Sequence, residues 1–280
     1  MRLFFALFAA LHFLAACGPR KQTEKPGRLR GYDLQRPFVL KLPLELDEIS
    51  GLAYVRKDKT LLAINDETGI LFKIDVHRPR YIQQWRFGPP GDYEDVATTD
   101  SLVYVLRSDG TLFEIHFKNK DTTLVRQFPF PQKGNEFESL QYLRQSRSLL
   151  LVCKACSADS KDEFSWYQFS LDSLQFEKQR VRFPVQKIEA LLNYKGKRFK
   201  PSGAALHPKT GNLYLISAVN NAIVVITPKM EVAEAAHLSG PVWLQPEGID
   251  FDGDGNMFIS NETNKVQAAN ILIFPYRPTH

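Results

Sequence analysis

The sequence predicts an all-β protein, a five-bladed β-propeller built from four-stranded antiparallel blades. One short phrase recurs five times along the chain, as EISGLAYV, YEDVAT, FESLQYL, PSGAALH and PEGIDFD. Matching positions of the phrase are Ser50, Glu94, Glu138, Ser202 and Glu247, so the steps between copies are 44, 44, 64 and 45 residues. A repeat in the forties that contains several strands and turns is typical of propeller blades.

The composition is that of an ordinary globular protein. Of its 280 residues, 44% are hydrophobic and 24% are charged, which suits one large domain or two small ones and not a disordered chain. The formal net charge of +5 is mild and scattered along the sequence. We therefore expect no nucleic-acid partner, and we expect a monomer.

Residues 1 to 16 predict a secretory leader. Arg2 is followed by the apolar run LFFALFAALHFLAA, which is too short for a well-behaved spanning helix. The leader runs into LAACG, which resembles a bacterial lipobox, so we expect Cys17 to be acylated and to become the new N-terminus. The protein would then be a lipoprotein of the cell envelope, tethered to a bacterial membrane on its periplasmic or outer-membrane side. The alternative is a soluble secreted protein in which Cys17 is only a leader residue.

The segment from Cys17 to about Arg36 predicts a flexible stalk that follows the lipidated cysteine. It is rich in Lys, Arg, Gln, Pro and Gly and shows no hydrophobic periodicity. We expect the propeller domain to occupy residues 37–280.

Within each repeat, short apolar runs bounded by Gly, Asp, Asn and Pro predict four strands. For the first, second and fourth repeats we expect strands at 51–55, 60–64, 70–76 and 81–87, at 96–98, 102–106, 111–117 and 123–128, and at 203–206, 212–217, 222–227 and 231–238. The fifth repeat supplies only three, at 249–252, 256–260 and 270–276. We expect 38–46 to add the missing outer strand and close the ring, because closure removes exposed sheet edges.

The long third step of 64 residues is interpreted as one blade with insertions. Its strands are expected at 149–153, 164–171 and 176–183, and helical spacing of Ile188, Leu191 and Leu192 predicts a short helix over 185–194. The alternative is a six-bladed ring with a degenerate blade.

Four motifs resemble those of a known family. They are LDEISGLAYV at 46–55, AINDETG at 63–69, FKPSGAALHPKTGNLYLIS at 199–217 and QPEGIDFDGDGNMFIS at 245–260. On these motifs the chain resembles the SdiA-regulated family of bacterial exported propellers, and it is also similar to propellers of the NHL and lactonase kinds. The resemblance implies a fold and no known reaction, so function has to be argued from the site.

Propeller geometry predicts where that site lies. The start of each innermost strand and the end of each second strand meet at one mouth of the central channel. The first set is Glu48, Ser50, Glu94, Asp95, Glu138, Ser139, Ser202 and Glu247, and the second is Asn65, Asp66, Glu67, Arg107, Asp109, Lys154, Asn220, Asn261 and Glu262.

The mouth is expected to be acidic. Glu94, Glu138 and Glu247 share one repeat column, with Ser50 and Ser202 in its other places. Carboxylates that lie so close together resist ionisation unless a positive group lies among them. Ca²⁺ is a suitable positive group, because it accepts 6 to 8 oxygen ligands. The further ligand candidates are Asn65, Asp66, Asn261 and Glu262. The alternative is that these side chains hydrogen-bond the neighbouring blade, or that Lys154, Lys200 and Arg107 neutralise them.

Other motifs are interpreted structurally. Asp252 to Asn256 lacks the glycine and glutamate of an EF-hand and predicts a turn at the opposite face, together with His207. Cys153 and Cys156 end a strand, where they form either a disulfide or two unpaired thiols.

The expected function is binding of a small-molecule or peptide ligand at the acidic mouth, through a divalent cation such as calcium. No G-x-S-x-G motif is present, and no Ser, His and Asp set is suggested by order or spacing. Turnover is therefore not the first expectation. The alternatives are a calcium-dependent hydrolase of an ester, lactone or phosphoester, and an envelope scaffold for protein interactions.

Overall fold

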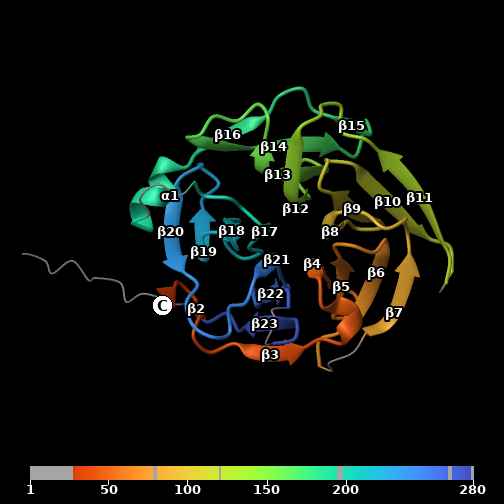
Figure 1. The fold of residues 1–280 in the computed structure, drawn as a ribbon, viewed down its shortest axis with the longest axis horizontal. Coiled ribbons are helices and arrows are strands. Elements are labelled where there is room, and N and C mark those ends of the chain that lie inside the picture. The colour runs from red at the N-terminus through yellow and green to blue at the C-terminus, as the bar shows by residue number, and fades with distance from the viewer. Residues whose placement is uncertain (1–27, 78–80, 120, 194–197, 264–266, 279–280) are drawn as a thin grey trace, which may run out of the picture.

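The computed structural model describes residues 28–77, 81–119, 121–193, 198–263 and 267–278, and these form a ring of five β-sheets. Figure 1 looks down the ring, with strands β4, β8, β12, β17 and β21 nearest its middle. Each of these strands contacts the corresponding strand of both neighbouring blades, so the five close a circle. The all-β, five-bladed propeller expected from the repeated phrase is confirmed.

Three blades follow the predicted order of four antiparallel strands. The first is β4 (Ile49–Val55), β5 (Thr60–Asn65), β6 (Ile70–Asp75) and β7 (Tyr81–Arg86), and the second is β8 (Tyr93–Thr98), β9 (Val103–Arg107), β10 (Leu112–Phe117) and β11 (Thr123–Phe128). The fourth is β17 (Gly203–Leu206), β18 (Leu213–Ser217), β19 (Ala222–Ile226) and β20 (Val232–His237). Second and third strands are buried on both faces, which explains their continuous apolar runs.

The fifth blade is completed by the beginning of the propeller domain. It contains β21 (Pro246–Phe251), β22 (Met257–Asn261), β23 (Asn270–Phe274) and, at its outer edge, β3 (Phe38–Lys41). Leu40 pairs with Ile271, and both side chains are buried against the first blade. The predicted closure is confirmed, with strand pairing ending at Lys41; the 3-10 helix η1 (Leu44–Leu46) then leads into β4.

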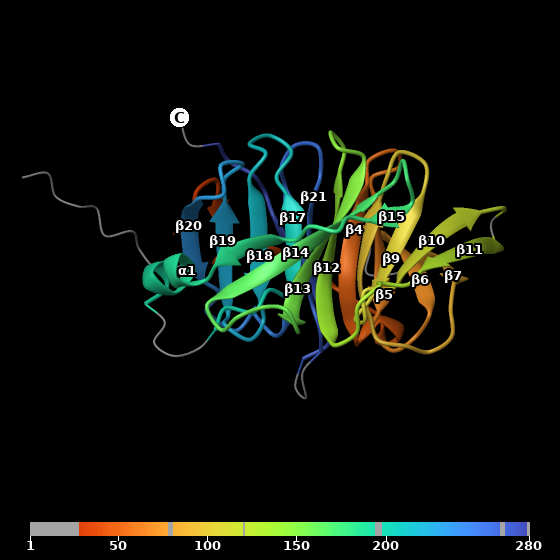
Figure 2. The same ribbon diagram turned by 90° about the horizontal axis from the view of Figure 1, so that it is seen from above.

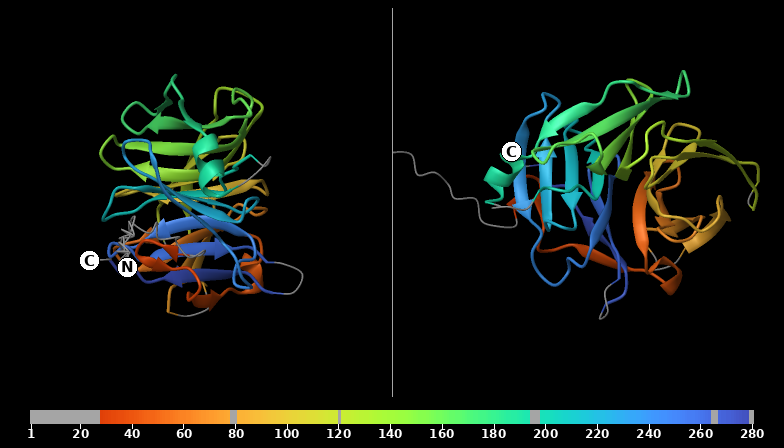
Figure 3. Two further views of the ribbon diagram at one scale, coloured as in Figure 1. Left: turned by 90° about the vertical axis from the view of Figure 1, so that its left-hand side faces the viewer. Right: turned by 45° about the horizontal axis from the view of Figure 1, so that its top comes forward.

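The 64-residue step between Glu138 and Ser202 contains one blade and not parts of two. The blade is β12 (Asn135–Leu143), β13 (Ser148–Cys156) and β14 (Glu163–Ser170), whose outer edge is paired by two short strands, β15 (Gln175–Phe176) and β16 (Val181–Pro184). The extra length lies in this split edge, in longer strands and in helix α1 (Gln186–Leu191), which lies on the outside of the ring beside β20 (Figures 1 and 3). The six-bladed alternative is therefore wrong.

Residues from 28 onward fold against the propeller, where the sequence predicted a stalk as far as about Arg36. Strands β1 (Arg28–Leu29) and β2 (Tyr32–Asp33) form a small hairpin. Leu29, Tyr32 and Leu34 are at most 5% exposed and join the core between the fourth and fifth blades. Burial of these three side chains explains why the segment is ordered despite its polar composition. The predicted leader, Cys17 and the rest of the stalk lie outside the described residues.

No described helix combines the length and the apolar character needed to cross a membrane.

Candidate functional site

Two sets of polar residues meet at one end of the ring, which we call the acidic mouth. The antiparallel register places the start of each inner strand beside the end of the second strand, as in the pairs Ile49 with Asn65 and Pro246 with Asn261. Figure 2 shows the ring from the side, with the inner strands running between its two ends. This is the convergence that the repeat pattern predicts.

Three glutamates of the repeated phrase are held in a largely buried, mutually repelling group. Glu138 is 4% exposed and accepts a hydrogen bond of 2.6 Å from Lys154 Nζ. Burial raises the pKa of Glu138 to about 7, and the nearby Glu247 raises it while Lys154 opposes the shift. Burial also raises the pKa of Glu247 to about 7. Glu94 has its pKa raised to about 10 by burial and by the charges of Glu138 and Asp92.

A second carboxylate group lies at the same mouth, and among the described residues no ion pair is formed with it. Glu48, Asp66 and Glu262 have carboxylate oxygens within 4.8 Å of one another. Burial and the charges of Glu48 and Glu67 raise the pKa of Asp66 to about 6. Burial, a hydrogen bond with Glu48 and the charge of Glu247 raise the pKa of Glu262 to about 9. In each case the folded protein favours the protonated acid, or a bound cation in place of the proton.

Several buried side-chain oxygens have no hydrogen-bond partner among the described residues, and Asp66 Oδ1 and Asn261 Oδ1 at this mouth are two of them. The amide nitrogen of Asn261 donates to the Val242 and Asn270 oxygens, which directs its Oδ1 away from those partners. Carboxylate and amide oxygens of this kind are the ligands that hard cations prefer.

The remaining predicted site residues hold the fold together. Ser50 Oγ donates to the Glu94 carbonyl at 2.6 Å, and Ser202 Oγ donates to the Pro246 carbonyl at 2.7 Å, so both hydroxyls join neighbouring blades. Asn65 Oδ1 accepts from two backbone N–H groups of the turn that follows β5. Of these three residues, none has an oxygen left without a partner, in contrast to Asp66 and Asn261.

The sequence analysis placed Glu48 at the mouth without making it a ligand candidate, and it missed Asp92 and Gln245. These three occupy one further repeat column, two residues before each phrase position; its members are Glu48, Asp92, Glu136, Lys200 and Gln245. Gln245 hydrogen-bonds Glu262, and Lys154 lies 3.2 Å from Glu136. This column could have been found by extending the repeat alignment two residues toward the N-terminus of each phrase copy.

Comparison with models of known protein families identifies the family of this chain. The family model described as SdiA-regulated matches residues 41–266, which span the first four blades and strands β21 and β22 of the fifth. The chain belongs to the SdiA-regulated family. The resemblance seen in the four sequence motifs is thereby confirmed, and a comparison with curated proteins finds no match.

Solved structures similar to this SdiA-regulated propeller include several enzymes and a calcium-binding protein. Glutaminyl cyclase from Myxococcus xanthus is 13% identical, with 86% of this chain and 97% of that chain covered and a TM-score of 0.57. Regucalcin from Agrobacterium tumefaciens, a calcium-binding protein, is 12% identical over 88% and 95%, with a TM-score of 0.53. Streptogramin B lyase is 10% identical over 86% and 98%, with a TM-score of 0.53. At these identities the likeness shows the fold alone.

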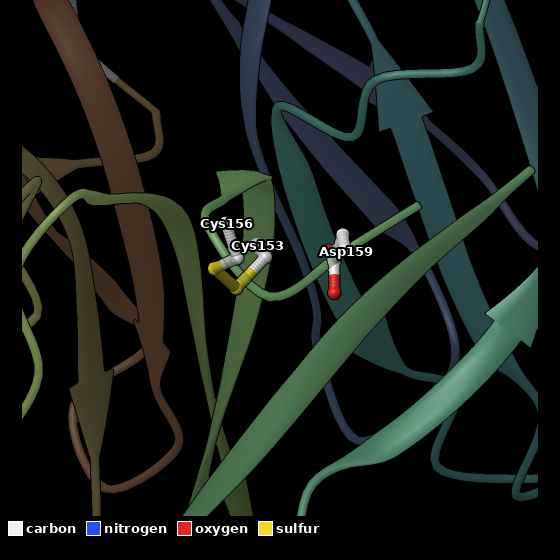
Figure 4. A group of neighbouring side chains, drawn as sticks. All are labelled: Cys153, Cys156 and Asp159. Atoms are coloured by element: carbon white, nitrogen blue, oxygen red, sulfur yellow. A yellow bond between two sulfur atoms is a disulfide. The ribbon is translucent and has the colours of Figure 1, made fainter. Parts of the chain in front are cut away.

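The cysteine pair of this family member is a disulfide and not a metal site. Cys153 and Cys156 are bonded to each other, and Asp159 follows on the next turn (Figure 4). The Asp159 carboxylate accepts hydrogen bonds from Arg180 and Ser165, so it is already neutralised. The group therefore offers no thiolate, and its carboxylate is occupied.

The turns predicted around Asp252–Asn256 and His207 lie at the end of the ring opposite the acidic mouth. Asp252 Oδ1 accepts from the backbone N–H groups of Asp254 and Asn256, which makes 252–256 a turn. His207 is fully buried, and its Nδ1 accepts from the backbone of Lys209 and Thr210, so it caps a turn as expected.

Proposed function

We propose that this protein binds a divalent cation, Ca²⁺ in preference to Mg²⁺, at the acidic mouth, and that the cation in turn holds an oxygen-rich small-molecule or peptide ligand. The observation that carries the proposal is the group of Glu48, Asp66 and Glu262, whose carboxylate oxygens lie within 4.8 Å of one another. The charge of Glu48 raises the pKa values of Asp66 and Glu262, and a cation removes that repulsion.

The residues present fit a calcium site. Glu48, Asp66 and Glu262 would provide the charged ligands, and Asn261 Oδ1 is a neutral oxygen that has no other partner among the described residues. Ca²⁺ accepts 6 to 8 oxygen ligands in irregular arrangements, whereas Mg²⁺ requires a near-octahedral set and retains waters. Regucalcin, a calcium-binding protein with the same fold, supports calcium as the first ion to test.

A second candidate function is metal-dependent hydrolysis of an ester, lactone or phosphoester. The observation that favours it is Glu94, whose pKa is raised to about 10 by burial and by Glu138, so that it keeps its proton at neutral pH. A protonated carboxyl near a cation can donate to a leaving oxygen. Among the described residues, no histidine lies at this mouth, which favours binding over turnover as the first function.

We also propose that Cys17 carries the lipid that anchors the protein in the cell envelope, because LAACG resembles a lipobox. Metabolic labelling with an alkyne fatty acid in a bacterial host tests this. We expect label in the unaltered chain and none in Cys17→Ser, and equal labelling of both would contradict it.

Thermal unfolding of the chain from Gly18 onward, stripped of metal and titrated with Ca²⁺ or Mg²⁺, tests the cation site. A ligand that binds only the folded state at a hundred times its Kd adds about 2.7 kcal/mol, which raises the Tm by several degrees. We expect this rise with Ca²⁺, a smaller one with Mg²⁺ and reversal by EDTA.

The decisive variants are Asp66→Asn and Glu262→Gln, which keep side-chain shape and remove charge. Both are expected to fold and to lose the calcium shift. The matched control is Asp254→Asn on the opposite end of the ring, where the side chain is 90% exposed. A calcium shift that survives in both mouth variants, or is absent from the unaltered chain, would reject the site and favour an envelope scaffold.

A further inference from the structure

A large cavity of the propeller lies at the end opposite the acidic mouth. Its volume is about 1040 Å³, at the upper end of the range for small-molecule sites. Its lining includes Leu52, Val96, Leu140 and Ile249, which lie two residues after the phrase position in four of the five copies, and it includes none of the carboxylates of the mouth. It is therefore a separate site from the proposed cation site.

Neighbouring inner strands are tightly packed between the acidic mouth and the cavity. A Cβ atom on Gly51 would lie 2.4 Å from Asp95 Cα, and one on Gly248 would lie 2.8 Å from the Ser50 carbonyl oxygen. Asp95 is buried beside Gly51 and accepts a 2.7 Å hydrogen bond from Leu140 N of the next blade. At these two glycines, neighbouring inner strands leave no space for a side chain between them.

The cavity extends from the ring centre into an apolar trough between the first and second blades. Trp85 and Phe117 line its outer part, with ring centroids 4.6 Å apart, and Leu62 and Val103 lie deeper. Phe117 is 41% exposed, although it has a large aromatic side chain. An apolar chain lying in the trough would cover this exposed ring.

The rim of the cavity is cationic. Five of its lining residues are Lys or Arg and two are Asp; they are Arg56, Lys57, Lys73, Arg144, Lys209, Asp100 and Asp250. Arg144 pairs with Asp100 at 2.6 Å, and Lys73 pairs with Asp58 outside the lining. Asp250 accepts a hydrogen bond of 2.6 Å from Tyr54 N in the floor. Arg56 and Lys57 have no ion-pair partner within the part of the chain that the structure describes.

From these features we propose that the cavity binds a single-chain anionic amphiphile of the fatty-carboxylate class. Its hydrocarbon chain occupies the trough lined by Trp85 and Phe117, and its carboxylate lies at the rim beside Arg56 and Lys57. The ligand has the opposite charge from the one that the acidic mouth accepts, so one propeller carries two sites of different chemistry.

The test is a titration with decanoate, followed by calorimetry and by tryptophan fluorescence, with decanol and decyltrimethylammonium as uncharged and cationic probes of equal chain length. Decanoate is expected to bind at least about tenfold more tightly than either, and to weaken as salt is raised, because the rim contacts are partly exposed. The fluorescence change is expected to disappear in Trp85→Phe.

Variants of the rim and of the trough, each with a matched control, measure the two contributions to decanoate binding separately. Arg56→Ser with Lys57→Ser, and Phe117→Ser, are each expected to raise the Kd for decanoate about tenfold. Lys59→Ser with Lys229→Ser, and Leu124→Ser, are the matched exposed controls outside the cavity and should leave it unchanged. Asp66→Asn at the acidic mouth should also leave decanoate binding unchanged, even if it abolishes a calcium effect.

Equal affinity for the three probes, or equal effects of cavity and control variants, would overturn the proposal. Binding to anionic phospholipid vesicles without binding to free decanoate would also overturn it, in favour of a membrane surface.

Discussion

At the residue scale, the carboxyl groups of the mouth have consequences for stability. The pKa values of Asp66, Glu138 and Glu247 are raised to about 6, 7 and 7, so the folded state holds protons that the unfolded chain releases. Such groups contribute stability at pH values below their unfolded pKa and lose it as the pH rises through the folded pKa. Between about pH 4.5 and pH 7, the cation-free mouth therefore becomes progressively destabilising.

We predict that Glu247→Gln stabilises the cation-free protein at pH 8 relative to pH 5. For one group shifted from 4.5 to about 7, the change is about 2 to 3 kcal/mol between the two pH values, at about 1.4 kcal/mol per pKa unit. Urea unfolding of both proteins at both pH values measures it, and the difference between the proteins cancels groups elsewhere, such as His207. A difference that does not change with pH would contradict the pKa shift.

The close approach of inner strands gives a second residue-level prediction. Gly51→Ala would place its Cβ 2.2 Å from Asp95 Oδ1 and 2.4 Å from Asp95 Cα, and backbone cannot move aside as a flexible side chain can. We expect a loss of about 2 to 4 kcal/mol in the free energy of unfolding. Gly253→Ala, with no atom within 4 Å of its Cβ, is the control and should change stability by less than about 0.5 kcal/mol. Similar losses in both would show that the inner strands are not tightly packed.

At the scale of elements, β3 closes the ring with only four residues, Phe38–Lys41. Leu40 is 9% exposed against the first blade, whereas Phe38 on the same strand is 67% exposed. Leu40→Ala is predicted to reduce the free energy of unfolding by about 2 to 4 kcal/mol, and Phe38→Ala by less than about 0.5 kcal/mol. Chemical denaturation measures both. Equal effects would mean that closure does not depend on the buried face of this strand.

The end of β13 carries both the disulfide and a lysine of the acidic mouth. Lys154 lies between the two bonded cysteines, Cys153 and Cys156, and donates to Glu138. Lys154 lowers the pKa of Glu138 against the effect of burial, so we predict that Lys154→Met raises it above about 7. Carboxyl NMR titration of selectively labelled glutamate measures this shift. Lys161→Met, an exposed lysine on the turn before β14, is the control, and an unchanged Glu138 titration in Lys154→Met would contradict the prediction.

At the scale of the whole molecule, the five blades act as five copies of one unit with different polar residues at equivalent places. The residues at the phrase position are Ser50, Glu94, Glu138, Ser202 and Glu247. The two serines donate hydrogen bonds to neighbouring blades. The charge of Glu138 raises the pKa of Glu94, and the charge of Glu247 raises the pKa of Glu138. A ring of this kind brings residues about 40 to 200 positions apart to one axis. The acidic mouth and the cavity lie toward opposite ends of the inner strands and share no lining carboxylate, so the two ends can differ in charge.

The sequence by itself determined the blade number, the strand order, the closing strand, the helix near Ile188 and the end of the ring where the glutamates meet. Each of these depends on patterns that repeat within or between units of about forty residues, which a single sequence displays directly. Only the tertiary structure decided that Ser50 and Ser202 bridge blades while Asp66 and Asn261 keep unpartnered oxygens. It also decided that residues from 28 onward are ordered and that a large cavity lies away from the mouth. Burial, proton affinity and cavity shape depend on distances between different blades, and no local pattern along the chain encodes those distances.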